Sequence, residues 1–192
     1  MNRTSIYDRL SERRLAQEAA ALAEQQAAGA VQAPLAQPEP VVPLQDAPSS
    51  FSFAGFNLLL PEGFRFRDIQ MTLEQNGEPV ALAIQRRDVH EGATLDGLLA
   101  QALQALRVLH PELRLIRERD CTLAGSAAMA VDFRFSLGNA ERHGRLVVSI
   151  VPVTGGQPPQ WLSLSCVVDP LKPSLSAWLI DFDTMLLGMT AR

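Results

Sequence analysis

Large apolar side chains alternate with polar or small ones on both sides of the dipeptide Asn76-Gly77. This dipeptide is the strongest short signal for a two-residue β-hairpin turn, because both of its positions must adopt positive φ angles. Residues 68–88 are therefore predicted to form a hairpin, which we call the first hairpin. In the register that this turn sets, one face of the hairpin is wholly apolar and consists of Ile69, Met71, Leu73, Val80, Leu82 and Ile84.

The other periodic stretches predict two helices and further strands. Apolar residues recur at helical spacing after Thr94, a favourable N-cap, and predict a helix over 94–109 that stops before Pro111. A second amphipathic helix is predicted over 172–188. Short apolar or alternating runs predict one or two strands over 51–61, single strands over 112–123 and 127–137, and a hairpin over 146–168.

The predicted order of elements is β-β-β-α-β-β-β-β-α, with short connections. This order indicates an α+β fold, in which helices pack on an antiparallel sheet. An Ala-rich helix with a thin apolar stripe is predicted over residues 1–30, and the five prolines of residues 31–50 predict a semi-extended linker. The folded domain is then expected over residues 51–192.

Charge and hydropathy narrow the choice of partners. The chain has 192 residues, 47% of them hydrophobic, and its net charge of −4 argues against nucleic acid, which needs a basic face. Residues 146–168 carry no charge, but three prolines and two glycines interrupt them, so we expect a hairpin of a water-soluble sheet and no stable membrane insertion. The N-terminal sequence MNRTSIYDRLSERRL lacks the apolar core of a secretory signal, which predicts a cytoplasmic location.

The sequence contains no group of residues that is typical of catalysis or metal binding. Cys121 and Cys166 lie far apart in predicted strands and are interpreted as small buried residues. The three histidines lie in predicted turns or at the ends of elements, and Asp181 and Asp183 are too close in sequence to share one helix face. We therefore predict no catalytic residue, no metal and no cofactor, and we expect that the protein is not an enzyme.

The apolar face of the first hairpin has two interpretations. In the first, its side chains are ordinary core residues beneath the domain's own helices. In the second, Ile69, Met71, Leu73, Leu82 and Ile84 line an apolar groove for a partner, because large exposed apolar patches on soluble proteins usually mark interaction sites. The pattern of residues leaves both interpretations open.

Several stretches of the chain resemble the DcrB/Eag family: LLLPEGF, IQMTLEQNGEPVALAIQRRDV, TLDGLLAQALQAL, TLAGSAAMAVDF and the closing WLIDFDTMLL. The resemblance covers about residues 53–188 and implies a PsbP-like α/β/α fold with a curved antiparallel sheet. The DcrB branch consists of envelope lipoproteins, and this chain lacks the lipidated cysteine that they need. The Eag branch consists of cytoplasmic, dimeric chaperones of type VI secretion, whose concave sheet surface shields N-terminal transmembrane helices of an effector before it is loaded on the secretion spike.

The resemblance thus implies a type VI secretion chaperone or adaptor that works as a homodimer, with the hydrophobic N-terminal helices of a secreted effector as its client. The implied client-binding groove falls on the apolar face of the first hairpin, at Ile69, Met71, Leu82 and Ile84. The polar residues that correspond to client contacts in the family are Gln101, Ser163 and Ser165.

Two further questions stay open at the level of sequence. Residues 1–50 are not part of the family pattern. Three roles are open for them: a tether for a second partner, a segment that fills the groove, or a tail without a specific role. The alternative function is a non-chaperone interaction module of the same fold that binds a soluble partner. This alternative predicts that the domain's own helices cover the apolar face of the first hairpin.

Overall fold

The structure is a computed structural model that describes residues 40–44, 50–53, 56–61, 64 and 66–189. The helix predicted over residues 1–30 and most of the linker predicted over 31–50 lie outside the described residues. The described residues belong to one compact unit, Pro40–Arg192. Within these ranges no helix is both long enough and apolar enough to cross a membrane.

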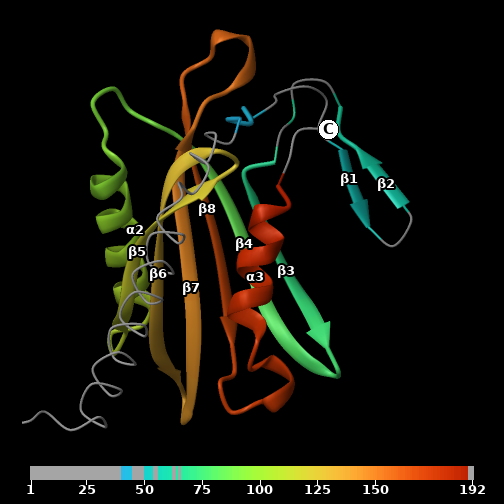
Figure 1. The fold of residues 1–192 in the computed structure, drawn as a ribbon, viewed down its shortest axis with the longest axis vertical. Coiled ribbons are helices and arrows are strands. Elements are labelled where there is room, and N and C mark those ends of the chain that lie inside the picture. The colour runs from blue at the N-terminus through green and yellow to red at the C-terminus, as the bar shows by residue number, and fades with distance from the viewer. Residues whose placement is uncertain (1–39, 45–49, 54–55, 62–63, 65, 190–192) are drawn as a thin grey trace, which may run out of the picture. The chain divides into compact units, whose positions relative to one another are not determined.

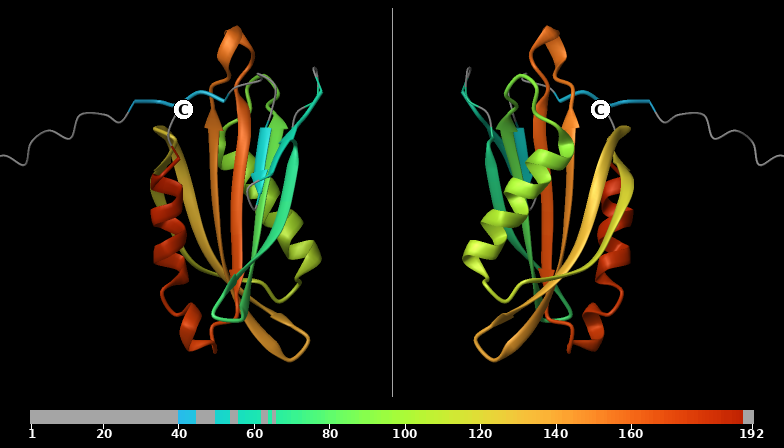
Figure 2. Two further views of the ribbon diagram at one scale, coloured as in Figure 1. Left: turned by 90° about the vertical axis from the view of Figure 1, so that its right-hand side faces the viewer. Right: turned by 90° about the vertical axis from the view of Figure 1, so that its left-hand side faces the viewer.

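A six-stranded sheet forms the centre of this unit, and all neighbouring strands in it are antiparallel. The strand order is β3-β4-β8-β7-β6-β5, so β3 and β5 are the edges (Figure 1). The helices α2 (Leu95–Leu109) and α3 (Trp178–Leu187) lie on opposite faces of the sheet (Figure 2). The strands are β3 (Asp68–Gln75), β4 (Glu78–Asp88), β5 (Arg114–Leu123), β6 (Ser126–Leu137), β7 (Ala140–Val151) and β8 (Gln160–Val168).

The structure agrees with one expectation about the local elements and corrects two others. A separate two-stranded sheet of β1 (Ser50–Phe53) and β2 (Phe56–Leu59) fills the stretch in which one or two short strands are predicted. The helix predicted over 172–188 begins later, because Pro173–Leu175 form a short 3-10 turn before α3. His143, expected in a turn or at the end of an element, lies inside β7, because the β6–β7 turn is already made at Gly138, where φ is 62°.

The first hairpin has the register that the sequence predicts. Asn76 and Gly77 form the turn with φ angles of 54° and 82°. On the strands that follow, Met71 lies opposite Leu82. Successive side chains of a strand point to opposite faces. The large apolar side chains of the hairpin therefore share one face of the sheet, and its small and polar side chains share the other.

A helix packs on each face of the antiparallel sheet through its own cluster of apolar side chains, which confirms the α+β class. On one face, Phe182 and Leu186 of α3 belong to the core cluster. On the other face, Leu99 and Leu103 of α2 belong to a second core cluster. The N-terminus of α2 is capped as predicted, since the Thr94 hydroxyl accepts a hydrogen bond from the Gly97 N–H at 3.2 Å.

A buried ion-pair network fixes α3 against the sheet. The Arg145 guanidinium on β7 donates to both carboxylate oxygens of Asp132, at 2.5 and 2.9 Å. It also lies 2.6 Å from the Asp183 carboxylate of α3 and donates to the Leu179 carbonyl at 2.9 Å. The hydrogen bonds with Asp132 raise the pKa of Arg145, so the guanidinium stays charged. These contacts connect α3 to β6 and β7.

Residues 40–44, which the sequence places in the linker, are hydrogen-bonded to one end of the sheet. The Val42 N–H donates to the Ala124 carbonyl, and the Leu44 N–H donates to the Pro152 carbonyl, both at 2.8 Å. Gly125 makes this contact possible, because a Cβ atom there would lie 2.5 Å from the Pro40 carbonyl oxygen. The compact unit therefore includes this short segment.

Candidate functional site

The apolar face of the first hairpin lies on the α3 side of the sheet. Leu82 is only 5% exposed and belongs to the core cluster that α3 closes. Met71, Leu73 and Ile84 are half-buried and pack against this cluster, and Ile69 is half-buried as well. The domain's own helix therefore covers the centre of this face, and only its outer side chains keep partial contact with water.

The three polar residues expected beside this face lie elsewhere. Ser163 is buried and Ser165 is half-buried on β8, and both belong to the α2 side of the sheet because they alternate with Leu164. Gln101 is an exposed residue of α2. The structure thus separates the eight expected residues into an apolar group on the α3 side, a serine pair on the α2 side and one residue on the outer helix. Client binding by any of them stays a prediction.

The opposite face of the first hairpin is open and continues onto β8. A hollow of about 320 Å³ lies over it, and Met71 and Leu82 also border this hollow. A second hollow, of about 370 Å³, shares Thr72, Ala81 and Val167 with the first and extends the surface to β6. We call this continuous surface the α2-side groove and define it by Gln70, Thr72, Ala81, Ala83, Phe135, Leu137, Ser165 and Val167.

The groove exists because α2 covers only part of its face of the sheet. Leu99 and Leu103 pack in a cluster with residues of β6 and β7 and with Trp161 at the start of β8. Strands are spaced about 4.8 Å apart, so six strands are roughly 24 Å wide, whereas one helix with its side chains is about 10 Å across. Among the described residues, the chain therefore provides one helix on this face where the sheet has room for two. No helix of this part of the chain lies over β3, β4 and the second half of β8.

The groove residues give only a weak signal in the sequence. Thr72, Ala81 and Ala83 belong to the side of the first hairpin that looks polar, because small side chains do not register as an apolar stripe. Their neighbours become visible only through the pairing of β4 with β8, which places Ser165 opposite Ala83 and Val167 opposite Ala81. A run of small residues facing another run of small residues across two strands is the pattern that indicates such a groove.

Charged residues at one end of the groove are paired with one another. The Lys172 ammonium donates to the Glu78 carboxylate at 2.9 Å, and the Arg142 guanidinium lies 2.8 Å from the Asp169 carboxylate. The hydrogen bond with Glu78 raises the pKa of Lys172. All four residues border the second hollow. The groove thus ends in neutralised pairs while its floor carries no charge, which favours an uncharged segment as its occupant.

The titratable groups of the described residues offer no reactive centre. No three His, Cys, Asp or Glu side chains in this part of the chain are grouped so that they can hold a metal ion. The His110 ring stacks on Phe135 with ring centroids 3.9 Å apart. Burial raises the pKa of the Cys121 thiol and raises that of Cys166 to about 11, so both thiols are protonated and unreactive at neutral pH.

These features define the protein as an α+β domain with a six-stranded antiparallel sheet between two helices. No family model matches the sequence, and no curated protein matches it. The crystal structure of PA94 from Pseudomonas aeruginosa, a protein of unknown function, is similar with a TM-score of 0.54 and 16% identity, over 76% of this chain and 97% of that chain. LpqN from Mycobacterium tuberculosis, involved in cell envelope biogenesis, has a TM-score of 0.43 and 14% identity, over 79% and 83%. At such low identity, the likeness to PA94 shows the fold alone.

Proposed function

We propose that this protein is a cytoplasmic chaperone or adaptor of type VI secretion, which shields the N-terminal transmembrane helices of an effector until the effector is loaded on the secretion spike. The observation that carries the proposal is the α2-side groove, where no helix of the described residues covers β3 and β4 beside the area that α2 covers. The resemblance of the sequence to the DcrB/Eag family, with its PsbP-like fold, supports the proposal.

A client helix fits the dimensions of the groove. The three strands β3, β4 and β8 span about 10 Å from the first to the third, which is roughly the diameter of a helix with its side chains. Packed helices lie about 8–10 Å apart. A helix in the groove therefore takes the vacant place beside α2 in the same layer and completes the cover of the sheet.

The side chains of the groove suit an apolar helix with bulky residues. Ala81, Ala83 and Ser165 are small, so they leave depressions that Leu, Ile or Phe side chains of a client can fill. Each such side chain gains roughly 1.5–3 kcal/mol when it leaves water completely. Phe135 and the 59% exposed Leu137 form an apolar wall at the β6 side.

A protein-interaction module that binds a soluble partner is the second candidate function. The observation that favours it is the burial of Leu82 beneath α3, because this function predicts that the domain's own helices cover the apolar hairpin face. The two functions differ in what occupies the α2-side groove: a transmembrane helix in the first, and no client helix in the second.

Co-expression of the full chain with a fusion protein tests the proposal. The fusion carries the N-terminal transmembrane helices of a type VI effector in front of a soluble reporter, and the reporter without the helices is the control. We expect the fusion to enter the soluble fraction, and to co-purify with the chain, only when the two are co-expressed, because shielding removes apolar surface from water. An insoluble fusion in the presence of the chain contradicts the chaperone function.

A further inference from the structure

A β-bulge in the edge strand β5 brings three arginines to one face of the sheet. The register of β5 and β6 shifts between Leu115 and Arg117, so the residue between them has no partner on β6. In a regular strand, Arg114 and Arg117 point to opposite faces, because they are three residues apart. The bulge instead aligns both with Arg119 on the α3 side, which illustrates how bulges redirect side chains.

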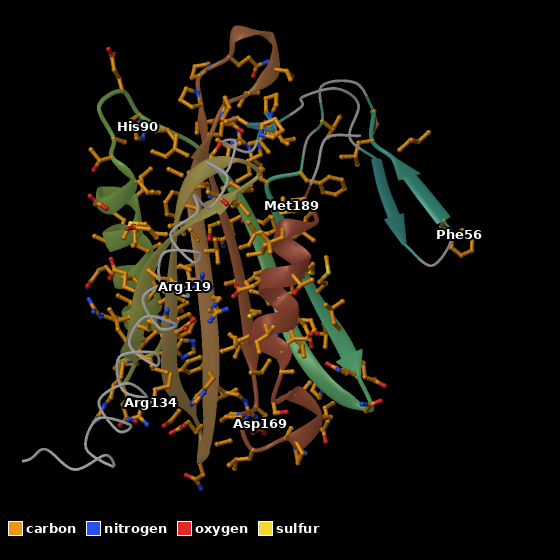
Figure 3. All side chains as sticks on the ribbon, in the orientation of Figure 1. Phe56, His90, Arg119, Arg134, Asp169 and Met189 are labelled. Atoms are coloured by element: carbon orange, nitrogen blue, oxygen red, sulfur yellow. The ribbon has the colours of Figure 1, made fainter. Side chains whose placement is uncertain are left out.

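The neighbouring strand adds a fourth arginine. Arg134 of β6 lies directly opposite Arg114, and like charges in this position destabilise an antiparallel pair. The nearest carboxylate of Arg134, that of Glu141, is 3.6 Å away. Figure 3 labels Arg119 and Arg134 on these strands. We call Arg114, Arg117, Arg119 and Arg134 the basic patch.

Two of the four arginines of the basic patch, Arg114 and Arg117, are not neutralised within the described part of the chain. Arg119 is paired with Asp183 at 2.7 Å, but the exposed guanidinium groups of Arg114 and Arg117 have no ion pair among the described residues. Elsewhere on the sheet, surface cations are paired at short range, as in Arg87 with Asp68 at 2.6 Å. In a chain with a net charge of −4, this local surplus of positive charge stands out.

A hollow of about 450 Å³ adjoins the basic patch. Arg114 and Arg134 border it together with the apolar side chains of Leu113 and Phe135. Glu112 and Glu141 border it as well, so the hollow is not a simple anion pocket. The remaining lining residues are Pro111 and Ser136. The combination of guanidinium groups and an apolar floor fits a polypeptide that carries both acidic and apolar side chains.

We propose that the basic patch docks an acidic polypeptide segment, at a site distinct from the α2-side groove. Guanidinium groups match carboxylates with two parallel hydrogen bonds, which fixes orientation as well as charge. The bulged residue Ile116 is 54% exposed, which adds apolar contact area at the strand edge. A single-stranded nucleic acid is disfavoured, because such partners need accessible aromatic faces for base stacking, and the Phe135 ring at the adjoining hollow is buried and already stacked with His110. The inference does not depend on the proposed function, since the four arginines lie on the α3 side of the sheet and the adjoining hollow shares only Phe135 with the α2-side groove.

Fluorescence anisotropy with a labelled glutamate-rich peptide tests this inference on the full chain. We expect binding at low ionic strength that weakens as salt is added, because exposed charges are screened. The exchange Arg117→Glu is expected to weaken binding by about tenfold, since it reverses a charge at the centre of the patch. The matched control is Arg107→Glu on α2, which makes the same change in charge at another exposed arginine and is expected to leave binding unchanged.

Three outcomes overturn the inference. The first is the absence of peptide binding by the wild-type chain at low ionic strength. The second is an equal loss of binding in Arg117→Glu and Arg107→Glu, which would assign the effect to overall charge. The third is tighter binding of a single-stranded DNA of the same net charge than of the peptide. Circular dichroism of both variants verifies that each is folded before binding is compared.

Discussion

Leu82→Asp is expected to unfold the domain. Leu82 is 5% exposed and lies in the core cluster beneath α3, so the new carboxylate is buried without a partner. Burial of an unpaired charge costs several kcal/mol, and the lost burial of the leucine adds roughly 1.5–3 kcal/mol. Domains of this kind are stable by about 5–15 kcal/mol, so the loss removes most of the stability. Circular dichroism and urea unfolding of the purified variant measure it.

The matched control for this prediction is the adjacent residue on the opposite face. Ala81 is exposed in the α2-side groove, and Ala81→Asp introduces the same carboxylate into water. We expect the free energy of unfolding of Ala81→Asp to stay within about 0.5 kcal/mol of the wild-type value. If Leu82→Asp were as stable as Ala81→Asp, α3 would not cover the hairpin, and the assignment of its two faces would be wrong.

Ala81→Asp is expected to weaken client binding strongly while the domain stays folded. Ala81 borders both hollows of the groove, so a client helix must desolvate the new carboxylate when it packs there. A penalty of about 2–3 kcal/mol corresponds to a loss of affinity of roughly 30- to 150-fold. The measurement is the amount of transmembrane fusion that co-purifies with the variant, relative to the wild-type chain.

Ala100→Asp provides the control for the groove variant. Ala100 is exposed on α2 and is not among the residues that define the α2-side groove, so the same chemical change there is expected to leave client recovery at the wild-type level. Equal client recovery with Ala81→Asp and Ala100→Asp would show that the client binds elsewhere. The half-buried side chains of Met71 and Ile84 on the α3 side would then be the next candidates.

The sequence predicted the local features of this fold correctly. Asn76-Gly77 fixed the turn and the register of the first hairpin, and Thr94 fixed the start of α2, because turn and cap chemistry depend on neighbouring residues only. The start of α3 was wrong by several residues, since Pro173 is compatible with a short 3-10 turn as well as with a helix start.

The candidate site depends on long-range packing that local patterns do not contain. Which face of the first hairpin is covered follows from Arg145, which holds α3 on one side, and from α2, which packs on β6 and β7 on the other. The groove itself arises where Ala83 of β4 meets Ser165 of β8, two residues far apart in the sequence. Small side chains at both positions carry no hydrophobic periodicity, so the groove is recognisable only when the strand order is known.

The bulge in β5 is a second feature that the alternation of side chains along the sequence does not reveal. Residues 112–123 look like a regular strand, in which Arg114 and Arg117 belong to opposite faces. The extra residue at Ile116 reverses the alternation and unites the arginines of the basic patch. The alternation of residues 112–123 alone therefore does not reveal this alignment.

Site-specific photocrosslinking shows directly whether a client helix lies in the α2-side groove. A photoreactive phenylalanine analogue replaces Leu137 at the rim of the α2-side groove in one variant, and Ile180 on the outer side of α3 in another. Both positions are well exposed, at 59% and 70%, so neither replacement disturbs the core. With the transmembrane fusion as client, binding in the α2-side groove predicts crosslinks from position 137 and none from position 180. Crosslinks from position 180 without crosslinks from position 137 would contradict it.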